Sequence, residues 1–310
     1  MSDATDYSSA LVDGPWRHEF VPANGSRFHV ATAGPVRTNG DRRPLVLFLH
    51  DFPQFWWAWR HQLAALAEAG VRVAAMDLRG VAASDKPPSG YDVLTRTRDV
   101  AGVVRSLGHE QAVVVGSGTG GLLAWAMGAL QPAVTAGVAA LGAPHPLRLH
   151  VPGRRLTTPA GRRLLAYSQL PSIPERRLSR GDGVDVVLAA GAARPLPTDV
   201  VERYRDVLRI PFAAHASVEA VRWLARASLR PDGRRYLAAL RNPVEVPVLQ
   251  VHGTMDGLLR LEGVEVDGAA LARRFRFEVV EDAGHLLAEE APEQVTELLA
   301  DWLGRSLDIG

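Results

Sequence analysis

The stretch 112-AVVVGSGTGGLLAW-125 decides the fold of this chain. It begins with a short, β-branched apolar run bounded by glycine, which is the pattern of a buried strand. The apolar residues from Leu122 onward suit a packed helix, so the glycines between the two runs must form a very tight turn. The sequence therefore predicts a strand, a turn and a helix in direct succession.

A glycine turn between a strand and a helix has two chemical uses. Gly116, Gly118 and Gly121 match the Gly-x-Gly-x-x-Gly turn that cradles a dinucleotide pyrophosphate. That use also needs an acidic residue at the end of the next strand, where it binds the ribose. The next apolar run, residues 134–141, carries no Asp, Glu or Arg. This absence argues against a dinucleotide cofactor.

The other use is an elbow that lifts a nucleophile above a parallel sheet, followed along the chain by an acid and a histidine. Asp256 comes after an apolar run that ends at Val251, and His285 comes after one that ends at Val280. Because parallel strands end at the same edge of a sheet, Asp256 and His285 can converge there. His285 would act as a base and Asp256 would orient its ring. Gly118 occupies the nucleophile position and has no side chain.

Strand and helix patterns alternate up to residue 146 and resume after residue 235. This rhythm predicts an α/β fold, with a mostly parallel sheet covered by helices on both faces. Residues 147–235 lack strand patterns and predict a helical cap inserted after the sixth strand. The core is expected over residues 15–146 and 236–310, and residues 1–14 are expected to form a flexible tail.

The amino-acid composition and the net charge indicate which classes of binding partner are expected. A net charge of +1 over 310 residues gives no overall attraction for nucleic acid. The absence of cysteine excludes disulfides and thiolate metal sites and fits a cytoplasmic location. No signal peptide or spanning helix is expected, and neither is a metal or a cofactor. The predicted cap holds 17 arginines against 8 acidic residues, which indicates a solvated, salt-bridged surface or one that meets an anionic membrane.

These motifs together resemble the α/β-hydrolase superfamily and, within it, the branch of epoxide hydrolases and haloalkane dehalogenases. The resemblance extends from Trp16 to Leu303. Besides the elbow, it rests on HDFPQFWWAWR (50–60), DLRG (77–80), SDKP (84–87), APHP (143–146), HGTMD (252–256) and GH (284–285). It implies a pocket for a small hydrophobic molecule between the core and the cap.

The resemblance also implies the site residues. In that family an aspartate at the position of Gly118 attacks the substrate, and two backbone N–H groups, here those of Phe52 and Thr119, form the oxyanion hole. His285 and Asp256 match the family's base and acid. The side chains expected to line the pocket are those of His50, Asp51, Trp125 and His145.

Three departures from the family pattern bear on activity. Gly118 cannot form the family's covalent ester. Asp51 stands where the family's His-Gly-x-Pro turn has glycine, and its carboxylate, if turned inward, would oppose an oxyanion. Where epoxide hydrolases carry cap tyrosines, this chain has Ala220 and Val221.

Several groups are candidates to replace what is missing. Ser117, Thr119 or a water beside His285 could replace the nucleophile, although Ser117 and Thr119 fit poorly because elbow neighbours usually point away from the apex. Tyr167 and Tyr204 are the candidates to replace the cap tyrosines.

Two functions remain open on this reasoning. One is an epoxide-hydrolase-like enzyme in which the Asp256–His285 pair acts as a general base on a small hydrophobic substrate. The other is a catalytically inactive pseudo-hydrolase that binds a ligand or serves as a scaffold, associated with a membrane through its basic cap.

Overall fold

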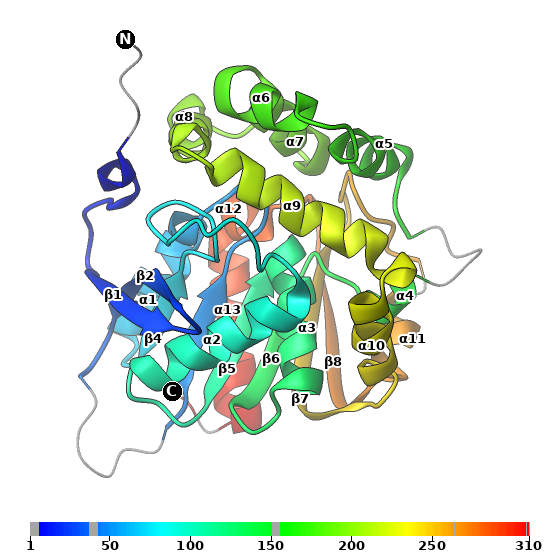
Figure 1. The fold of residues 1–310 in the computed structure, drawn as a ribbon. Helices are drawn as coiled ribbons and strands as arrows, with labels where there is room; N and C mark the ends of the chain where they lie inside the picture. Colours follow the sequence, from blue (N-terminus) through cyan, green and yellow to red (C-terminus); the bar gives the residue numbers. More distant parts are fainter. Residues whose placement is uncertain (1–5, 37–42, 151–155, 263, 308, 310) are drawn as a thin grey trace.

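The structure is a computed structural model that describes residues 6–36, 43–150, 156–262, 264–307 and 309. Its centre is an eight-stranded sheet in the order β1-β2-β4-β3-β5-β6-β7-β8 (Figure 1). The strands are β1 (Arg17–Ala23), β2 (Ser26–Ala33), β3 (Leu45–Leu49), β4 (Val73–Met76), β5 (Ala112–Ser117), β6 (Thr135–Leu141), β7 (Val244–Gly253) and β8 (Ala272–Val280). Neighbours are parallel from β4 to β8, whereas β1 and β2 form an antiparallel hairpin at one edge.

Helices cover both faces of this sheet, which is why its central strands are apolar throughout. Every residue of β3 and of β5 is buried. Helices α1 (Arg60–Glu68) and α13 (Pro292–Leu307) pack on one face, and α2 (Val93–Ser106) and α3 (Gly118–Leu130) pack on the other (Figure 1). The predicted α/β class is confirmed, because a sheet buried on both faces needs continuous apolar strands.

The predicted elbow is present in its tightest form: β5 ends at Ser117 and α3 begins at Gly118. Two glycines allow α3 to approach the sheet this closely. A Cβ atom on Gly116 would lie 2.2 Å from the carbonyl oxygen of Gly120, and one on Gly120 would lie 2.3 Å from that of Leu49. The glycines of the opening stretch therefore serve the contact between helix and strands.

Between β6 and β7 the chain forms a run of helices, most of which make up the cap. The helices of this run are α4 (Pro146–Leu149), α5 (Pro159–Ser168), α6 (Ile173–Arg180), α7 (Gly183–Gly191), α8 (Thr198–Arg209) and α9 (Ala213–Arg226), followed by η3 (Ala227–Leu229) and α10 (Pro231–Ala239). Helices α5 to α9 lie above the core (Figure 1). The predicted boundary at residue 235 cuts through α10, whose Tyr236 and the following Leu240 are buried in the core. Helix α10 therefore belongs to the core, because its apolar face packs there.

The flexible tail expected over residues 1–14 stays a prediction, and the structure describes residues 6–14 of it but not residues 1–5. A short helix, η1 (Tyr7–Ala10), ends in a buried alanine. The indole N–H of Trp56 donates to the carbonyl of Ala10 at 2.8 Å, and that of Trp16 donates to Val12 at 2.7 Å. Tryptophans further along the chain thus hold this segment against the core.

The remaining elements are η2 (Trp56–Trp59), α11 (Val264–Ala269) and α12 (Leu287–Glu290). Among the described helices, none is both long enough and apolar enough to cross a membrane.

Candidate active site

Asp256 and His285 converge as predicted, from the loops that follow β7 and β8. The Nδ1–H of His285 donates to Oδ2 of Asp256 at 2.8 Å. The other carboxylate oxygen, Oδ1, accepts the backbone N–H groups of Leu258 at 2.8 Å and Leu259 at 2.9 Å. Burial would raise the pKa of Asp256, but His285 and these N–H groups hold it below its usual value. Asp256 is therefore an ionised, fixed acceptor for the histidine ring.

Backbone contacts fix the loop that carries His285. The N–H of His285 donates to the carbonyl of Gly191, at the end of cap helix α7, at 2.9 Å. Glu290 accepts the N–H groups on either side, from Gly284 at 3.1 Å and from Leu286 at 3.0 Å. The position of His285 thus depends on both the cap and α12.

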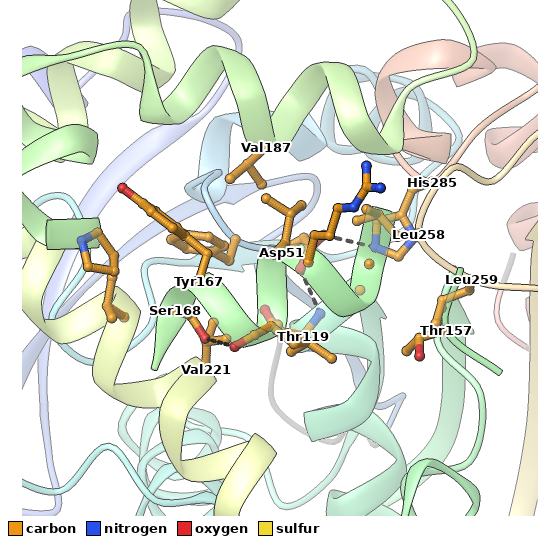
Figure 2. A pocket seen from close by; sticks show the side chains of 18 of the residues that line it. Asp51, Thr119, Thr157, Tyr167, Ser168, Val187, Val221, Leu258, Leu259 and His285 are labelled. Atoms are coloured by element: carbon orange, nitrogen blue, oxygen red, sulfur yellow. Dashed lines mark hydrogen bonds and ion pairs between the residues drawn. The ribbon is translucent and has the colours of Figure 1, made fainter. Parts of the chain in front are cut away.

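The carboxylate of Asp51 fills the place that a side chain at the elbow apex would take. Gly118 has φ of +48°, and a Cβ atom built on it would lie 2.1 Å from Cγ of Asp51. Oδ1 of Asp51 accepts the N–H of Thr119 at 2.7 Å, and Oδ2 lies 3.3 Å from Nε2 of His285 (Figure 2). The side chain of Asp51 is 4% exposed. It therefore points inward, and the space beside His285 predicted for a water holds a carboxylate.

His50 holds the backbone that presents Asp51. Its Nδ1–H donates to the carbonyl of Asp51 at 2.9 Å, and its Nε2 accepts the N–H of Leu78 at 3.1 Å. Burial lowers the pKa of His50 below its ordinary value, so the ring is neutral, which these two contacts require. The carbonyl of Asp51 also accepts the N–H of Gln54 at 2.9 Å. His50 is thus a buried support for the turn.

His285 lies between two carboxylates. Asp256 contacts Nδ1 and Asp51 contacts Nε2. Burial alone would lower the pKa of His285, but Asp256 and Asp51 raise it well above its usual value. The ring therefore carries a proton on each nitrogen near neutral pH, in a site that excludes most water.

These groups form the floor of a cavity of about 440 Å³ between core and cap. Asp51, Phe52, Thr119 and His285 line it from the core side. Most of the wall is aliphatic, including Leu122, Leu149, Leu164, Val187, Val218 and Leu258. A cavity of this size, with a mostly aliphatic wall and a few polar side chains, suits a small hydrophobic ligand.

The candidate replacements for the cap tyrosines do not reach Asp51. The Tyr204 hydroxyl donates to Glu289 and is buried away from the cavity lining. Tyr167 lines the cavity, but Figure 2 shows its hydroxyl pointing away from Asp51. Val221 lines the cavity and adds an apolar surface.

Three other predicted positions also lie outside the cavity lining. Trp125, on α3, and His145, which precedes α4, pack against each other at 4.8 Å between ring centroids, so both are core residues and their assignment to the pocket is wrong. Ser117 is 2% exposed, and its hydroxyl has no hydrogen-bond partner within the described structure. Ser117 is therefore a poor candidate to replace the nucleophile, because its buried side chain does not line the cavity.

A second cavity of about 20 Å³ adjoins Asp51 and is lined by His50, Arg96 and Ser217, among others. This is room for one water molecule. Arg96 is 5% exposed, and its Nε has no partner within the described residues. Burial lowers the pKa of Arg96 to about 10, so the guanidinium keeps its charge at neutral pH.

One group of described residues offers atoms at metal-binding spacing: Glu175, His215 and Glu219 in the cap. Arg222 already donates to Glu175 at 2.6 Å and to Glu219 at 2.7 Å. A guanidinium thus neutralises the carboxylates that a cation would need.

The sequence comparison agrees with this geometry. A model of the alpha/beta hydrolase fold family matches residues 44–292, which is most of the chain. This chain belongs to the α/β-hydrolase fold family.

Named relatives place this α/β-hydrolase among epoxide-hydrolase-like proteins. It is 32% identical to the AB hydrolase superfamily protein YfhM of Bacillus subtilis, over 92% of this chain and 97% of that one. It is 30% identical to epoxide hydrolase 3 of Xenopus tropicalis, over 90% of this chain and 75% of that one. The solved structure of epoxide hydrolase A from Mycobacterium thermoresistibile matches with a TM-score of 0.75 and 25% identity, over 95% and 100% of the two chains.

Sequence reasoning placed Asp51 in the pocket of this α/β-hydrolase but missed its position at the elbow apex. Two departures from the family pattern, taken together, could have indicated this position. The family pattern has glycine after the histidine of His-Gly-x-Pro and aspartate at the elbow, whereas this chain has Asp51 and Gly118. The two residue types are exchanged between two loops that face each other.

Proposed function

We propose that this α/β-hydrolase opens small apolar epoxides by adding water. The observation that carries the proposal is the chain of contacts Asp51–His285–Asp256 at the floor of an apolar cavity. His285 is the group that exchanges protons with the reacting atoms, because its Nε2 faces the cavity and its Nδ1 is held by Asp256. The names of the relatives support the substrate class.

The cavity supports an apolar substrate in particular. Aliphatic side chains from α3 and from cap helices line most of it, Asp51 and His285 lie at its floor, and the cap adds a few polar side chains, among them Arg163 and Arg177. An epoxide carries one weakly polar oxygen on a hydrocarbon frame, so it loses little hydration on entering such a cavity. Closure by the cap also excludes water, which strengthens the electrostatic contacts of His285.

The test measures diol formation from a panel of aryl and alkyl epoxides by wild type and by His285→Ala. Loss of the proton-transfer group is expected to lower kcat/KM by about 10²–10⁴-fold. His215→Ala is the matched control, because His215 lies on α9 with 48% of its side chain exposed. Equal rates for wild type and His285→Ala, or no diol from any epoxide, would contradict the proposal.

The second candidate function is ligand binding without chemistry. The lack of a side chain at Gly118 and the apolar Ala220 and Val221 in the cap favour it. It predicts that an apolar epoxide binds and is recovered unchanged. Calorimetric binding combined with product analysis on the same samples separates the two functions, since only an enzyme yields diol.

A further inference from the structure

We propose that Asp51 is the nucleophile of this protein and that it forms a covalent ester with the substrate from a loop outside the elbow. This inference rests on the proposed function and assigns its reacting group. In an ordinary elbow one residue provides both the tight turn and the attacking side chain, whereas in this chain Gly118 and Asp51 share these two roles. Gly118 supplies the turn, and Asp51 supplies the side chain.

The first support is where the carboxylate lies. A Cβ atom on Gly118 would fall 2.1 Å from Cγ and 2.2 Å from Oδ2 of Asp51, so the carboxylate occupies the volume of an apex side chain. Asp51 also lines the cavity. An attacking group needs this location, next to both the bound substrate and the histidine.

The second support is the different environment of the two carboxylate oxygens. Oδ1 accepts the Thr119 N–H at 2.7 Å, whereas Oδ2 faces Nε2 of His285 at 3.3 Å. If Oδ2 forms the ester, Oδ1 becomes its carbonyl oxygen. The Thr119 N–H then already touches the atom on which negative charge develops when water attacks that ester. The inward carboxylate therefore uses the oxyanion donor and does not compete with it.

The third support is the supply of protons. Both ring nitrogens of His285 face a carboxylate, so the ring donates on both sides as an imidazolium. Among the described residues that line the cavity, His285 is the acid placed beside Asp51, because the Tyr167 hydroxyl points away. The imidazolium is thus the proton donor for a leaving oxygen.

These contacts define a first step that balances. Oδ2 of Asp51 attacks an epoxide carbon and forms a C–O bond. The ring C–O bond breaks, and its electron pair goes to the epoxide oxygen. That oxygen takes the Nε2 proton of His285 and becomes a hydroxyl. The step leaves a neutral Asp51 ester and a neutral His285.

The second step restores the enzyme. Neutral His285 takes a proton from water while the water oxygen attacks Cγ of Asp51, and the negative charge moves to Oδ1 at the Thr119 N–H. The bond from Cγ to Oδ2 then breaks, Oδ2 leaves with the product as an alkoxide, and this alkoxide takes the proton of the new carboxylic acid. The products are the diol, the Asp51 carboxylate and the His285 imidazolium. The sum is epoxide plus water to diol.

Whether the leaving group takes a proton from His285 also distinguishes one class of substrate from another. A strained cyclic ether accepts the proton of His285 and thereby leaves the neutral ring that the second step needs. An alkyl halide departs as an anion without a proton, so alkylation of Asp51 leaves the proton on His285, and this proton must be lost to solvent before His285 can activate water. We therefore expect epoxides to be turned over faster than haloalkanes.

The decisive experiment uses enzyme in excess over an epoxide, in water enriched in the heavy oxygen isotope. An Asp51 ester gives an unlabelled diol in the first turnover and places the heavy oxygen in the peptide that contains Asp51, as mass spectrometry of a digest shows. Direct attack by water gives a labelled diol and an unlabelled protein. That second result overturns the inference and leaves the proposed function intact.

A second measurement looks for covalent adducts on the protein. The protein is exposed to epoxides and to reactive haloalkanes, digested, and analysed by mass spectrometry whether or not a product forms. A covalent adduct on Asp51 supports the inference even where no diol forms, in which case only the proposed function fails. No heavy oxygen and no adduct at Asp51 with any of these electrophiles overturns the inference.

Substitutions provide an independent test. Asp51→Asn keeps an oxygen for the Thr119 N–H and is expected to fold, but it should lower kcat by about 10³-fold or more. Asp182→Asn, an exposed cap aspartate, is the control. Gly118→Asp alone places two carboxylates in one volume and should be inactive, whereas Asp51→Gly combined with Gly118→Asp should recover activity above either single variant. Full activity in Asp51→Asn overturns the assignment.

Discussion

At Gly118 the backbone has φ of +48°, a conformation that costs a residue with a side chain about 1–3 kcal/mol. The larger constraint is space, because the carboxylate of Asp51 lies where a Cβ would be. Glycine at this position therefore relieves strain and also makes room for a functional group from another loop. Glycine is expected at this position both in an elbow that has lost its activity and in an elbow whose nucleophile comes from another loop. The position of the Asp51 carboxylate distinguishes the two cases.

Gly118→Ala tests this use of space. One methyl group should displace the Asp51 carboxylate by about an ångström and lower kcat by about 10²-fold, since a shift of that size in a reacting group has such an effect. Gly304→Ala in α13 is the control, because a Cβ atom there meets nothing within 4 Å. Steady-state kinetics on the best epoxide provide the measurement. Unchanged kcat in Gly118→Ala would show that the apex is open.

His145 should make stability depend on pH. Burial, with Arg148 nearby, lowers the pKa of His145 to about 3, whereas in the unfolded chain it is about 6.5. Between these values the unfolded chain binds a proton and the folded one does not, so stability falls as the pH drops below about 6.5. By about pH 5 the loss is about 2 kcal/mol.

His145→Asn isolates this contribution, because asparagine can still accept the N–H of Leu147 at the start of α4. Urea unfolding from about pH 7.5 to about pH 5 should lower the stability of the wild type by about 2 kcal/mol more than that of the variant. If the stabilities of the wild type and of the variant fall equally with pH, His145 does not change its protonation on unfolding. His252, whose pKa burial lowers to about 4, adds the same trend to both proteins.

At the scale of elements, α12 joins the loop that carries His285 to the cap. Glu290 accepts the N–H groups of Gly284 and Leu286 and also that of Ala193, which follows α7, at 2.7 Å. One carboxylate thus fixes the loop of His285 from both sides. Glu290 is a positioning residue, since it acts on the reaction only through His285.

Glu290→Ala should lower kcat by about 10²-fold, as expected when a reacting group loses its fixed position. It should also shift the pH profile, because a displaced His285 loses its fixed contact with Asp51. Glu290→Gln keeps a carbonyl oxygen and should recover part of kcat, and Glu293→Ala on the exposed side of α13 is the control. If Glu290→Ala lowers the stability of the protein but leaves the pH profile of kcat unchanged, the role of Glu290 is structural only.

Helix α8 of the cap is fixed to the core through Glu289. Its carboxylate, on a side chain only 2% exposed, accepts two hydrogen bonds from Arg60, at 2.7 and 2.8 Å, and one from the Tyr204 hydroxyl. Removing the cation leaves a buried charge without its partner. Such a change costs about 3–5 kcal/mol, whereas losing an exposed pair costs less than about 1 kcal/mol.

Arg60→Met should therefore destabilise the protein by about 3–5 kcal/mol in chemical unfolding, and adding Glu289→Gln should recover part of that loss. Arg209→Met, which breaks an exposed pair with Asp206, is the matched control. Additive effects of Arg60→Met and Glu289→Gln would contradict the coupling of these residues.

At the scale of the whole molecule, the cavity of about 440 Å³ lies between two layers that come from different parts of the chain. A ligand that fills it contacts the core floor and the cap wall together. Because such a ligand binds only the folded protein, 100 times its Kd should add about 2.7 kcal/mol of stability and raise Tm by about 5 °C. A thermal shift of the same size in a variant with Val221→Arg, which fills the cavity, would place the ligand elsewhere.

Some of the arginines of the cap pair with acidic residues of the cap. Arg177 pairs with Asp182, and Arg205 pairs with Asp185. These pairs support the interpretation of a solvated, salt-bridged surface. Association with an anionic membrane stays a hypothesis, and co-sedimentation with anionic and with neutral vesicles is its measurement. Equal binding to both would contradict an electrostatic contact.

The sequence by itself determined the order of strands and helices, the α/β class, the elbow and the pairing of Asp256 with His285. Each of these depends on local apolar pattern or on the rule that parallel strands end at one edge. It failed where a contact between distant segments decides, as in the docking of α10 on the core. The pocket assignments of Trp125 and His145 failed for the same reason.

Only the tertiary structure decided what occupies the apex of the elbow. The direction of the Asp51 side chain is set by three contacts: the empty volume at Gly118, the N–H of Thr119 and the ring of His285. Gly118 and Thr119 belong to the elbow, and His285 belongs to the loop after β8, so the two segments lie far apart in the chain. Asp51 and Gly118 each look like a loss of function when read alone, and they become complementary once β3 and β5 lie side by side.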